Sequence, residues 1–137
     1  MNAEKITTLP RQTPPIILVV DDDVIARCLI SDELRARGFK VLEAHSAPEA
    51  IKVLGKVHID LLLVEIYLAG ALGGLDVIRR AQTYSRATRI ILTSNQGASA
   101  PELDLSDLGT FVPKPISIPN LLDVVSGSLN WPSGPQA

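Results

Sequence analysis

The sequence predicts an α/β protein whose parallel sheet is covered by helices on both faces. Short, wholly apolar runs such as Ile16–Val20 suit strands that are buried on both sides. Amphipathic stripes with helical spacing lie between these runs, and runs and stripes alternate along the chain. Such alternation is typical of parallel strands joined by right-handed crossovers. With 137 residues, 46% of them hydrophobic, the chain suits a single domain.

The pattern predicts five strands and about five helices. Strands are expected at residues 16–20, 39–44, 59–64, 89–93 and 110–112. The first helix is expected to end at Gly38, a C-cap glycine. Its inner face is expected to consist of Ala26, Leu29, Ile30 and Leu34.

Capping signals and apolar spacing define the later helices. The run from Ser46 to Glu49 is a capping-box signature. Ser117 is expected near the start of the last helix. Residues 95–109 predict only a short or irregular helix, because glycine and serine dilute the apolar spacing there. The helix after the second strand is expected to place Ala50, Ile51 and Leu54 on its inner face, and the helix after the third strand Leu75, Ile78 and Ala81. The last helix is expected to place Leu121, Leu122, Val125 and Leu129 on its inner face.

The ends of the chain differ in composition from its middle. We expect residues 1–15 to form a flexible leader, 16–130 the folded domain and 131–137 a flexible tail with Trp131 as a candidate anchor. The leader has no apolar signal core, and no apolar stretch approaches the length of a membrane span. We therefore expect a cytoplasmic protein.

The charge argues against some classes of partner, and the cysteine content argues against an internal disulfide. The net charge of −2 is spread over interspersed acids and bases, which argues against nucleic-acid and membrane partners. Cys28 is the single cysteine of the sequence, so no internal disulfide forms. Its apolar neighbours predict a buried packing residue.

Chemically active side chains follow the predicted strands at their carboxyl ends. These ends meet at one edge of a parallel sheet, where such folds place their sites. Carboxylates, a hydroxyl and an ammonium together suit a divalent cation beside a phosphoryl group. Taken one at a time, these residues are better explained as a polar turn, a solvated strand end or a surface lysine. Taken together at matching strand ends, they favour a functional site. The residues are Asp21, Asp22, Glu65, Thr93 and Lys114.

The chain resembles the receiver domain of two-component response regulators from about Ile16 to Leu129. The resemblance rests on four motifs, which are ILVVDDD at 17–23 with Arg27 following, DLLLVE at 60–65 with a glycine-rich loop after it, ILTS at 91–94 and FVPKP at 111–115. It implies a doubly wound, flavodoxin-like five-stranded sheet with strand order 2-1-3-4-5. It also implies a role in two-component signal transduction rather than catalysis.

The resemblance assigns a role to each matching residue. Asp21 and Asp22 form the acidic pocket, Asp22 being the expected direct Mg²⁺ ligand. Glu65 stands at the phosphoacceptor and metal-binding position, and the backbone carbonyl of Tyr67 is implied as a further metal ligand. Thr93 is implied as the phosphoryl sensor and Lys114 as the residue that pairs with the phosphoryl group. Phe111 stands at the aromatic switch position but has no hydroxyl, and Pro115 is expected to follow a cis peptide bond.

Glu65 departs from the family pattern, which has aspartate there. Mg²⁺ demands near-ideal octahedral geometry, so a carboxylate that is longer by one methylene is expected to weaken Mg²⁺ binding without abolishing it. Ala69 replaces the common proline of the loop, and Gly73 replaces an aspartate. Both changes suit a site whose fine geometry is no longer required.

Three functional readings of Glu65 follow. The preferred hypothesis is a stand-alone pseudo-receiver that acts by protein contact without phosphorylation. In a variant of it, Glu65 contacts Lys114 or Thr93 and fixes an active-like state. In the third reading Glu65 is phosphorylated slowly and the protein is a switch. A structural alternative is a solvated carboxylate, repelled by Asp21 and Asp22, that turns toward water.

Other classes of function fit the sequence less well. A small Mg²⁺-dependent phosphohydrolase needs a general acid, and neither His45 nor His58 lies at a carboxyl strand end. A nucleotide-binding module lacks a glycine-rich loop after the first strand. The expected partner is a histidine kinase, a phosphotransfer protein, another signalling protein or a second copy of the chain.

Overall fold

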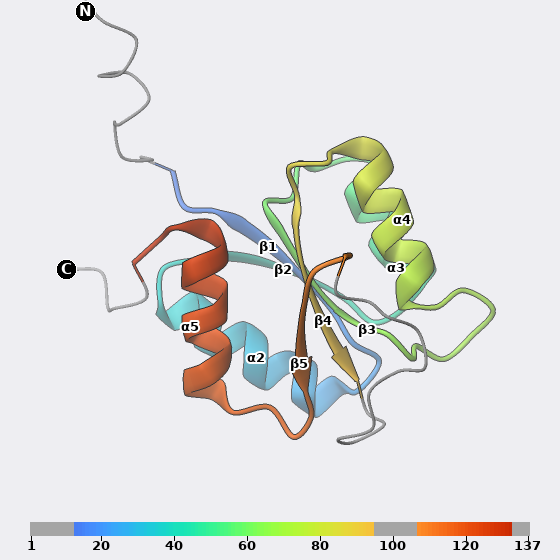
Figure 1. The fold of residues 1–137 in the computed structure, drawn as a ribbon. Helices are drawn as coiled ribbons and strands as arrows, with labels where there is room; N and C mark the ends of the chain where they lie inside the picture. Colours follow the sequence, from blue (N-terminus) through green and yellow to red (C-terminus); the bar gives the residue numbers. More distant parts are fainter. Residues whose placement is uncertain (1–12, 95–106, 133–137) are drawn as a thin grey trace, which may run out of the picture.

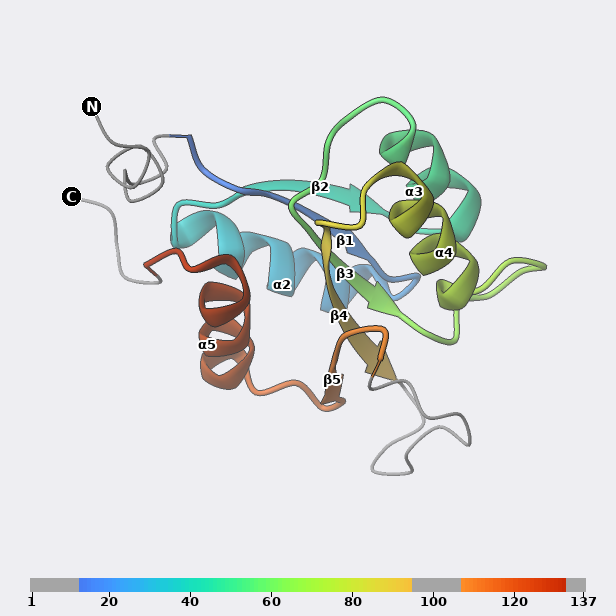
Figure 2. The same ribbon diagram turned by 45° about the horizontal axis from the view of Figure 1, so that its top comes forward.

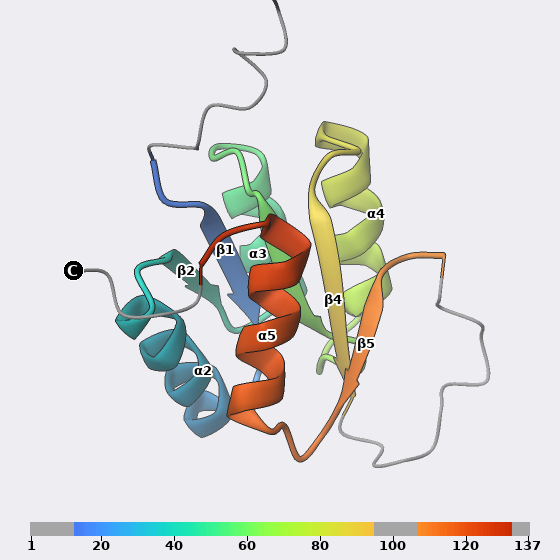
Figure 3. The same cartoon turned by 60° about the vertical axis from the view of Figure 1, so that its left-hand side comes forward.

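The computed structural model describes residues 13–94 and 107–132 and contains a five-stranded parallel sheet between two layers of helices (Figure 1). The strand order β2-β1-β3-β4-β5 confirms the predicted fold class. Helices α2 and α5 cover one face of the sheet, and α3 and α4 cover the other (Figure 3). The bounds are β1 Ile16–Val20, α2 Val24–Ala36, β2 Lys40–Ala44, α3 Ala47–Leu54, β3 Leu61–Glu65, α4 Gly74–Tyr84, β4 Arg89–Ser94, β5 Thr110–Pro113 and α5 Ile118–Leu129.

The central strands are apolar because both of their faces are covered. Alternate residues of β1, β3 and β4 point to opposite sides of the sheet and form two separate core clusters. Leu18, Leu62 and Leu92 belong to the cluster under α3 and α4. Ile17 and Leu63 belong to the cluster under α2 and α5. The observed strands lie within two residues of the predicted ranges.

Helix α2 is capped by Asp23 at its start and ends on the predicted glycine. The Asp23 carboxylate accepts hydrogen bonds from the backbone N–H groups of Ile25 and Ala26, as an N-cap does. At the other end Gly38 adopts φ 93°, the left-handed conformation that glycine reaches without strain. The predicted glycine at the end of the first helix is therefore confirmed.

Two predictions about α2 are wrong. Leu29 was expected on the inner face but is 53% exposed, and Cys28, expected to be buried, is exposed. The inward side of the helix is formed by Ile30, Ser31 and Leu34. Residues 28 and 29 lie about 100–200° around the helix from Ile30, because each residue turns the chain by about 100°. Apolar character alone did not identify the buried side.

The remaining helices start at hydroxyl caps where the sequence offers one. The Ser46 hydroxyl accepts from the backbone N–H of Glu49, and the Glu49 carboxylate accepts from the N–H of His45 rather than from Ser46. The predicted cap therefore forms without the reciprocal bond of a capping box. Ser117 caps α5 by accepting from Asn120 N–H.

The end of the described chain is tied to the core. Trp131 packs against the cluster under α2 and α5, so its predicted role as an anchor is confirmed. Among the described residues, no helix is long and apolar enough to cross a membrane. The expected leader through residue 12, the last five residues of the expected tail and most of the expected irregular helix lie outside the described residues.

Candidate functional site

Three of the predicted residues meet at the carboxyl edge of the sheet, around the ammonium group of Lys114. Its Nζ lies 2.7 Å from Oδ2 of Asp21 and 3.1 Å from Oε1 of Glu65. Both carboxylates are buried, and the lysine side chain is 13% exposed. The site is thus a buried ion-pair cluster in which one ammonium bridges two carboxylates.

The strand register brings these three side chains together. In the parallel sheet β1 pairs with β3, β3 with β4 and β4 with β5, so the strand ends lie side by side (Figure 2). Asp21 follows the last residue of β1, Glu65 ends β3, and Lys114 follows β5. Charged side chains are tolerated here because they end the strands instead of interrupting them.

Glu65 is fully buried, with an exposed fraction of 0%. Its Oε2 accepts a hydrogen bond of 3.0 Å from the backbone N–H of Tyr67, while Oε1 faces Lys114. The reading of Glu65 as a solvated carboxylate is therefore wrong. The Lys114 ammonium and the Tyr67 N–H supply part of the stabilisation that water would give, so the side chain does not need to turn outward.

Burial and charge pull the pKa values at this cluster in opposite directions. Burial raises the pKa of Glu65, and the Tyr67 N–H and Lys114 offset this only in part. Burial lowers the pKa of Lys114, but its hydrogen bonds and ion pairs with Asp21 and Glu65 outweigh that effect and leave the pKa raised. Lys114 is therefore firmly cationic at neutral pH.

The acidic residues are engaged by the protein's own hydrogen-bond donors. Asp21 Oδ1 accepts from the backbone N–H of Asp23, and Asp22 Oδ2 accepts from the N–H of Ala69. In the described part of the chain, no three His, Cys, Asp or Glu side chains group closely enough to hold a metal ion. The side chains of Asp21, Asp22 and Glu65 are therefore not grouped this closely, and the expected Mg²⁺ ligand set of these residues with the Tyr67 carbonyl stays a prediction.

Glu43 is a contributor that sequence reasoning missed. Arg27 donates through Nη1 to the backbone carbonyl of Asp21 at 2.8 Å and through Nε to Glu43 at 3.2 Å. Arg35 donates to the other oxygen of Glu43 at 3.1 Å. Glu43 thereby fixes two arginines of α2 and, through Arg27, the backbone of the acidic pocket. The available signal was a glutamate that follows Val41 and Leu42 within β2.

The remaining predicted residues surround the cluster. Thr93 is 2% exposed, beside Glu65 in the register of β3 and β4. Phe111 is half-buried and packs against the core cluster under α3 and α4. The peptide bond between Lys114 and Pro115 is cis. Tyr67 is 45% exposed, so its ring lies outside the buried cluster.

The loop from β3 to α4 passes very close to the strand that carries Glu65. A Cβ atom on Gly74 would lie 2.3 Å from the backbone oxygen of Glu65 and 2.8 Å from the Cα of Ile66. Backbone atoms cannot move aside as a flexible side chain can, so glycine is required at position 74. Gly70 has φ 110°, which also favours glycine.

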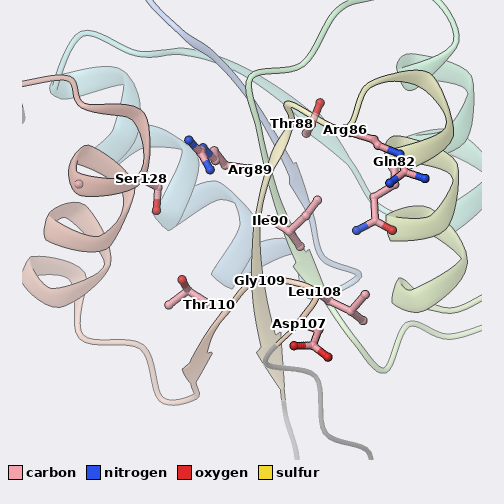
Figure 4. A pocket seen from close by; sticks show the side chains of 11 residues that line it. Gln82, Arg86, Thr88, Arg89, Ile90, Asp107, Leu108, Gly109, Thr110 and Ser128 are labelled. Carbon is pink, nitrogen blue, oxygen red and sulfur yellow. The ribbon is translucent and has the colours of Figure 1, made fainter.

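A separate polar hollow lies at the opposite, amino edge of the sheet (Figure 4). Its volume is about 590 Å³, and its lining includes Arg86, Arg89 and Thr110, near the first residues of β4 and β5. No residue of the Lys114 cluster lines it. This hollow is therefore distinct from the site that the sequence predicted.

The family of response regulator receiver domains matches residues 17–126 of the chain. The chain belongs to this family. The receiver domain is 28% identical over 118 residues to the autoinducer 1 sensor kinase/phosphatase LuxN of Vibrio campbellii and 32% identical over 101 residues to the regulatory protein VirG of Rhizobium rhizogenes. These matches cover 85% and 72% of this chain.

Solved structures agree with that assignment. A response regulator receiver protein from Pseudomonas putida is 31% identical, with a TM-score of 0.74 and coverage of 85% of this chain and 99% of that one. The receiver domain spans less than half the length of the curated relatives, 14% of LuxN and 42% of VirG. Receiver domains are generally signalling switches that interact with histidine kinases and other signalling partners, and they typically bind Mg²⁺ at the acidic pocket.

Proposed function

We propose that this receiver domain is a pseudo-receiver, a module for protein contact in two-component signalling that takes no phosphoryl group at Glu65. The observation that carries the proposal is the buried bridge from Glu65 through Lys114 to Asp21. In this bridge the carboxylate at the acceptor position is already paired with Lys114, the lysine that would pair with a phosphoryl group. The Glu65 carboxylate therefore has an ion-pair partner before any donor arrives, although its Oε1 accepts no hydrogen bond.

The position of the Glu65 carboxylate argues against phosphoryl transfer. An acceptor must point an oxygen at the donor phosphorus in line, but Oε1 faces Lys114 and Oε2 is held by the Tyr67 N–H. The extra methylene displaces the carboxylate by about 1.5 Å relative to aspartate, one carbon–carbon bond. A misplacement of about 1 Å can cost roughly 100-fold in rate.

The same bridge supports a narrower version of the proposal, in which Glu65 substitutes for the phosphoryl group and holds one fixed state. A carboxylate carries one negative charge, whereas a phosphoryl group carries nearly two. Burial compensates in part, because an ion pair is stronger where water is excluded. The Lys114 contact would then be permanent and not switched on by a kinase.

The exposed side of α2 supports action by protein contact. Val24, Ile25 and Leu29 are 59%, 80% and 53% exposed, and Cys28 is exposed beside them. These residues lie at i, i+1, i+4 and i+5 and form one apolar stripe, which we call the α2 stripe. Exposed apolar surface of this kind is typical of interaction sites. The partner we propose is a histidine kinase or a phosphotransfer protein in the cytoplasm.

Intact-mass spectrometry after incubation with acetyl phosphate and Mg²⁺ tests the proposal. We expect the wild type to stay unmodified and the Glu65→Asp variant to gain one labile phosphoryl group, because the shorter side chain vacates the space beside Lys114. Glu65→Gln, which offers no nucleophilic carboxylate, sets the background. A labile adduct on the wild type, absent from Glu65→Gln, would show a phosphorylated switch and overturn the proposal.

Mg²⁺ takes no step in the proposed function. Lys114 and backbone N–H groups engage both carboxylate oxygens of Asp21 and Glu65 and one oxygen of Asp22. This arrangement offers Mg²⁺ fewer ligand oxygens than an open acidic pocket, which supports weakened binding. The weakened binding expected from Glu65 remains part of the proposal.

A further inference from the structure

The face of the molecule formed by α3 and α4 carries positive charge on a chain that is negative overall. Residues 47–58 and 74–86 contain five lysines and arginines against two acids, a net charge of +3, whereas the rest of the chain carries −5. The two helices lie side by side on one side of the sheet (Figures 1 and 2). We call this surface the basic face. Its cations are Lys52, Lys56, Arg79, Arg80 and Arg86.

Most of these cations have no partner within the described residues. Arg79 approaches an acid, with Nη1 4.0 Å from Oδ1 of Asp76, and the other four form no ion pair with any described residue. All five are exposed. Figure 4 shows Arg86 on the α4 side of β4, whereas Arg89 points toward α5 and so lies outside the basic face. The partial negative charge at a helix C-terminus accounts for a cation at Lys56 but not for five.

A hollow of about 270 Å³ lies within the basic face, between the carboxyl-terminal ends of α3 and α4. The buried side chains of Leu54, Ile59 and Ala81 line it. Lys56, His58 and Tyr84 also line it and are exposed. We call this feature the α3–α4 hollow; it combines buried apolar side chains with a polar rim that carries one lysine, Lys56.

We propose that the α3–α4 hollow docks an acidic segment of a partner protein, which places one apolar side chain on the floor and its carboxylates against the surrounding cations. Tyr84 is 54% exposed and offers an aromatic surface with a hydroxyl, a side chain enriched in binding hot spots. Arg80 lies one turn before Tyr84 on α4, on the same side of the helix. The proposal goes beyond the proposed function, because it involves no residue of the Lys114 cluster.

The size and charge of the surface favour an acidic protein segment over other anions. A hollow of about 270 Å³ holds a side chain, whereas small-molecule pockets typically span roughly 300–1,000 Å³. An extended polyanion such as DNA, or an anionic membrane, would also meet the −5 carried by the rest of the chain. A short segment contacts the basic face alone.

NMR titration of the ¹⁵N-labelled chain with a synthetic peptide, in which one phenylalanine is flanked by glutamates, tests the proposal. We expect amide shifts concentrated at residues 54–59 and 80–86. Lys56→Glu and Arg80→Glu should each weaken binding at least about threefold, and more so at low salt. Tyr84→Ala should weaken it about fivefold, as loss of a hot-spot side chain does.

Matched controls make the result decisive. Lys40→Glu reverses an exposed charge on β2, outside the basic face, and should leave binding unchanged. Lys56→Gln, which removes the charge without reversing it, and thermal unfolding of every variant exclude misfolding as the cause. Absence of shifts at millimolar peptide, shifts elsewhere, or equal binding of a peptide with glycine in place of phenylalanine would overturn the proposal. So would stronger shifts at the same residues with duplex DNA or phosphatidylserine vesicles.

Discussion

Glu65 is a carboxylate with no access to water. Its position at the end of a buried strand excludes solvent, and its length lets it reach Lys114. Asp21 shares the same ammonium, so the three groups form one electrostatic unit. Changing any one of them leaves a buried charge with fewer partners, which is costly in a low-dielectric interior.

The raised pKa of Glu65 predicts a pH-dependent stability difference between the wild type and Glu65→Gln. The folded state holds the Glu65 proton more tightly than the unfolded state, whose pKa is near 4.5. The stability contributed by this group therefore falls as the pH rises from about 4.5 through the higher folded pKa. Glutamine has no such titration.

Urea unfolding between pH 4.5 and 7.5 measures this effect. The free energy of unfolding of Glu65→Gln, minus that of the wild type, should increase with pH over the first part of this range. Other titrating groups are common to both proteins and largely cancel. A difference that stays constant with pH would show that Glu65 titrates normally in the folded state.

A pair of glycine substitutions tests the close approach of the loop at Gly74 to the backbone of Glu65. Gly74→Ala should destabilise the domain by about 1–3 kcal/mol, because its Cβ meets backbone atoms of Glu65 and Ile66. Gly127→Ala in α5 meets nothing within 4 Å and should be neutral or stabilising by up to about 1 kcal/mol. Chemical denaturation compares the two; equal effects would contradict the steric account.

At the scale of elements, the two sides of α2 make different contacts: one side packs on the sheet and the other faces solvent. Its inner side, with Ile30 and Leu34, packs on the sheet, and Arg27 secures the backbone of the acidic pocket. Its outer side presents the α2 stripe to solvent. The helix therefore links the Lys114 cluster to the surface proposed for partner contact.

Substitutions on the two sides of α2 should separate stability from binding. Ile25→Ser and Leu29→Ser should change the free energy of unfolding by no more than about 0.5 kcal/mol, since both side chains are already exposed. Leu34→Ala, at 0% exposed, should cost about 2–5 kcal/mol. Thermal or urea unfolding measures both. A large loss from Leu29→Ser would mean that the α2 stripe belongs to the core.

On the scale of the whole molecule, one sheet forms part of two cores and separates the apolar α2 stripe from the basic face. The core clusters under α2 and α5 and under α3 and α4 share the strands β1, β3 and β4. The Lys114 cluster lies at the carboxyl edge of the sheet. The basic face lies on the α3 and α4 side. A partner on the α2 stripe and one at the α3–α4 hollow would thus use opposite sides of the sheet.

The sequence by itself determined the fold and which charged residues lie together at the carboxyl edge of the sheet. Buried parallel strands require continuous apolar runs, and the polar residues that follow them must meet at one edge, so Asp21, Glu65 and Lys114 could be grouped from their positions alone. Capping residues such as Ser46 and Ser117 act on their own helix within a few residues, so the sequence predicts them as well.

Only the tertiary structure decided how the charges pair and which apolar residues stay outside. The orientation of Glu65 toward Lys114 and not toward Asp22 depends on Lys114, a residue that follows another strand and lies far away in the sequence. The exposure of Leu29 depends on which side of α2 meets the sheet. Both are long-range packing outcomes, and the local pattern of a sequence does not record which distant group will fill the space beside a side chain.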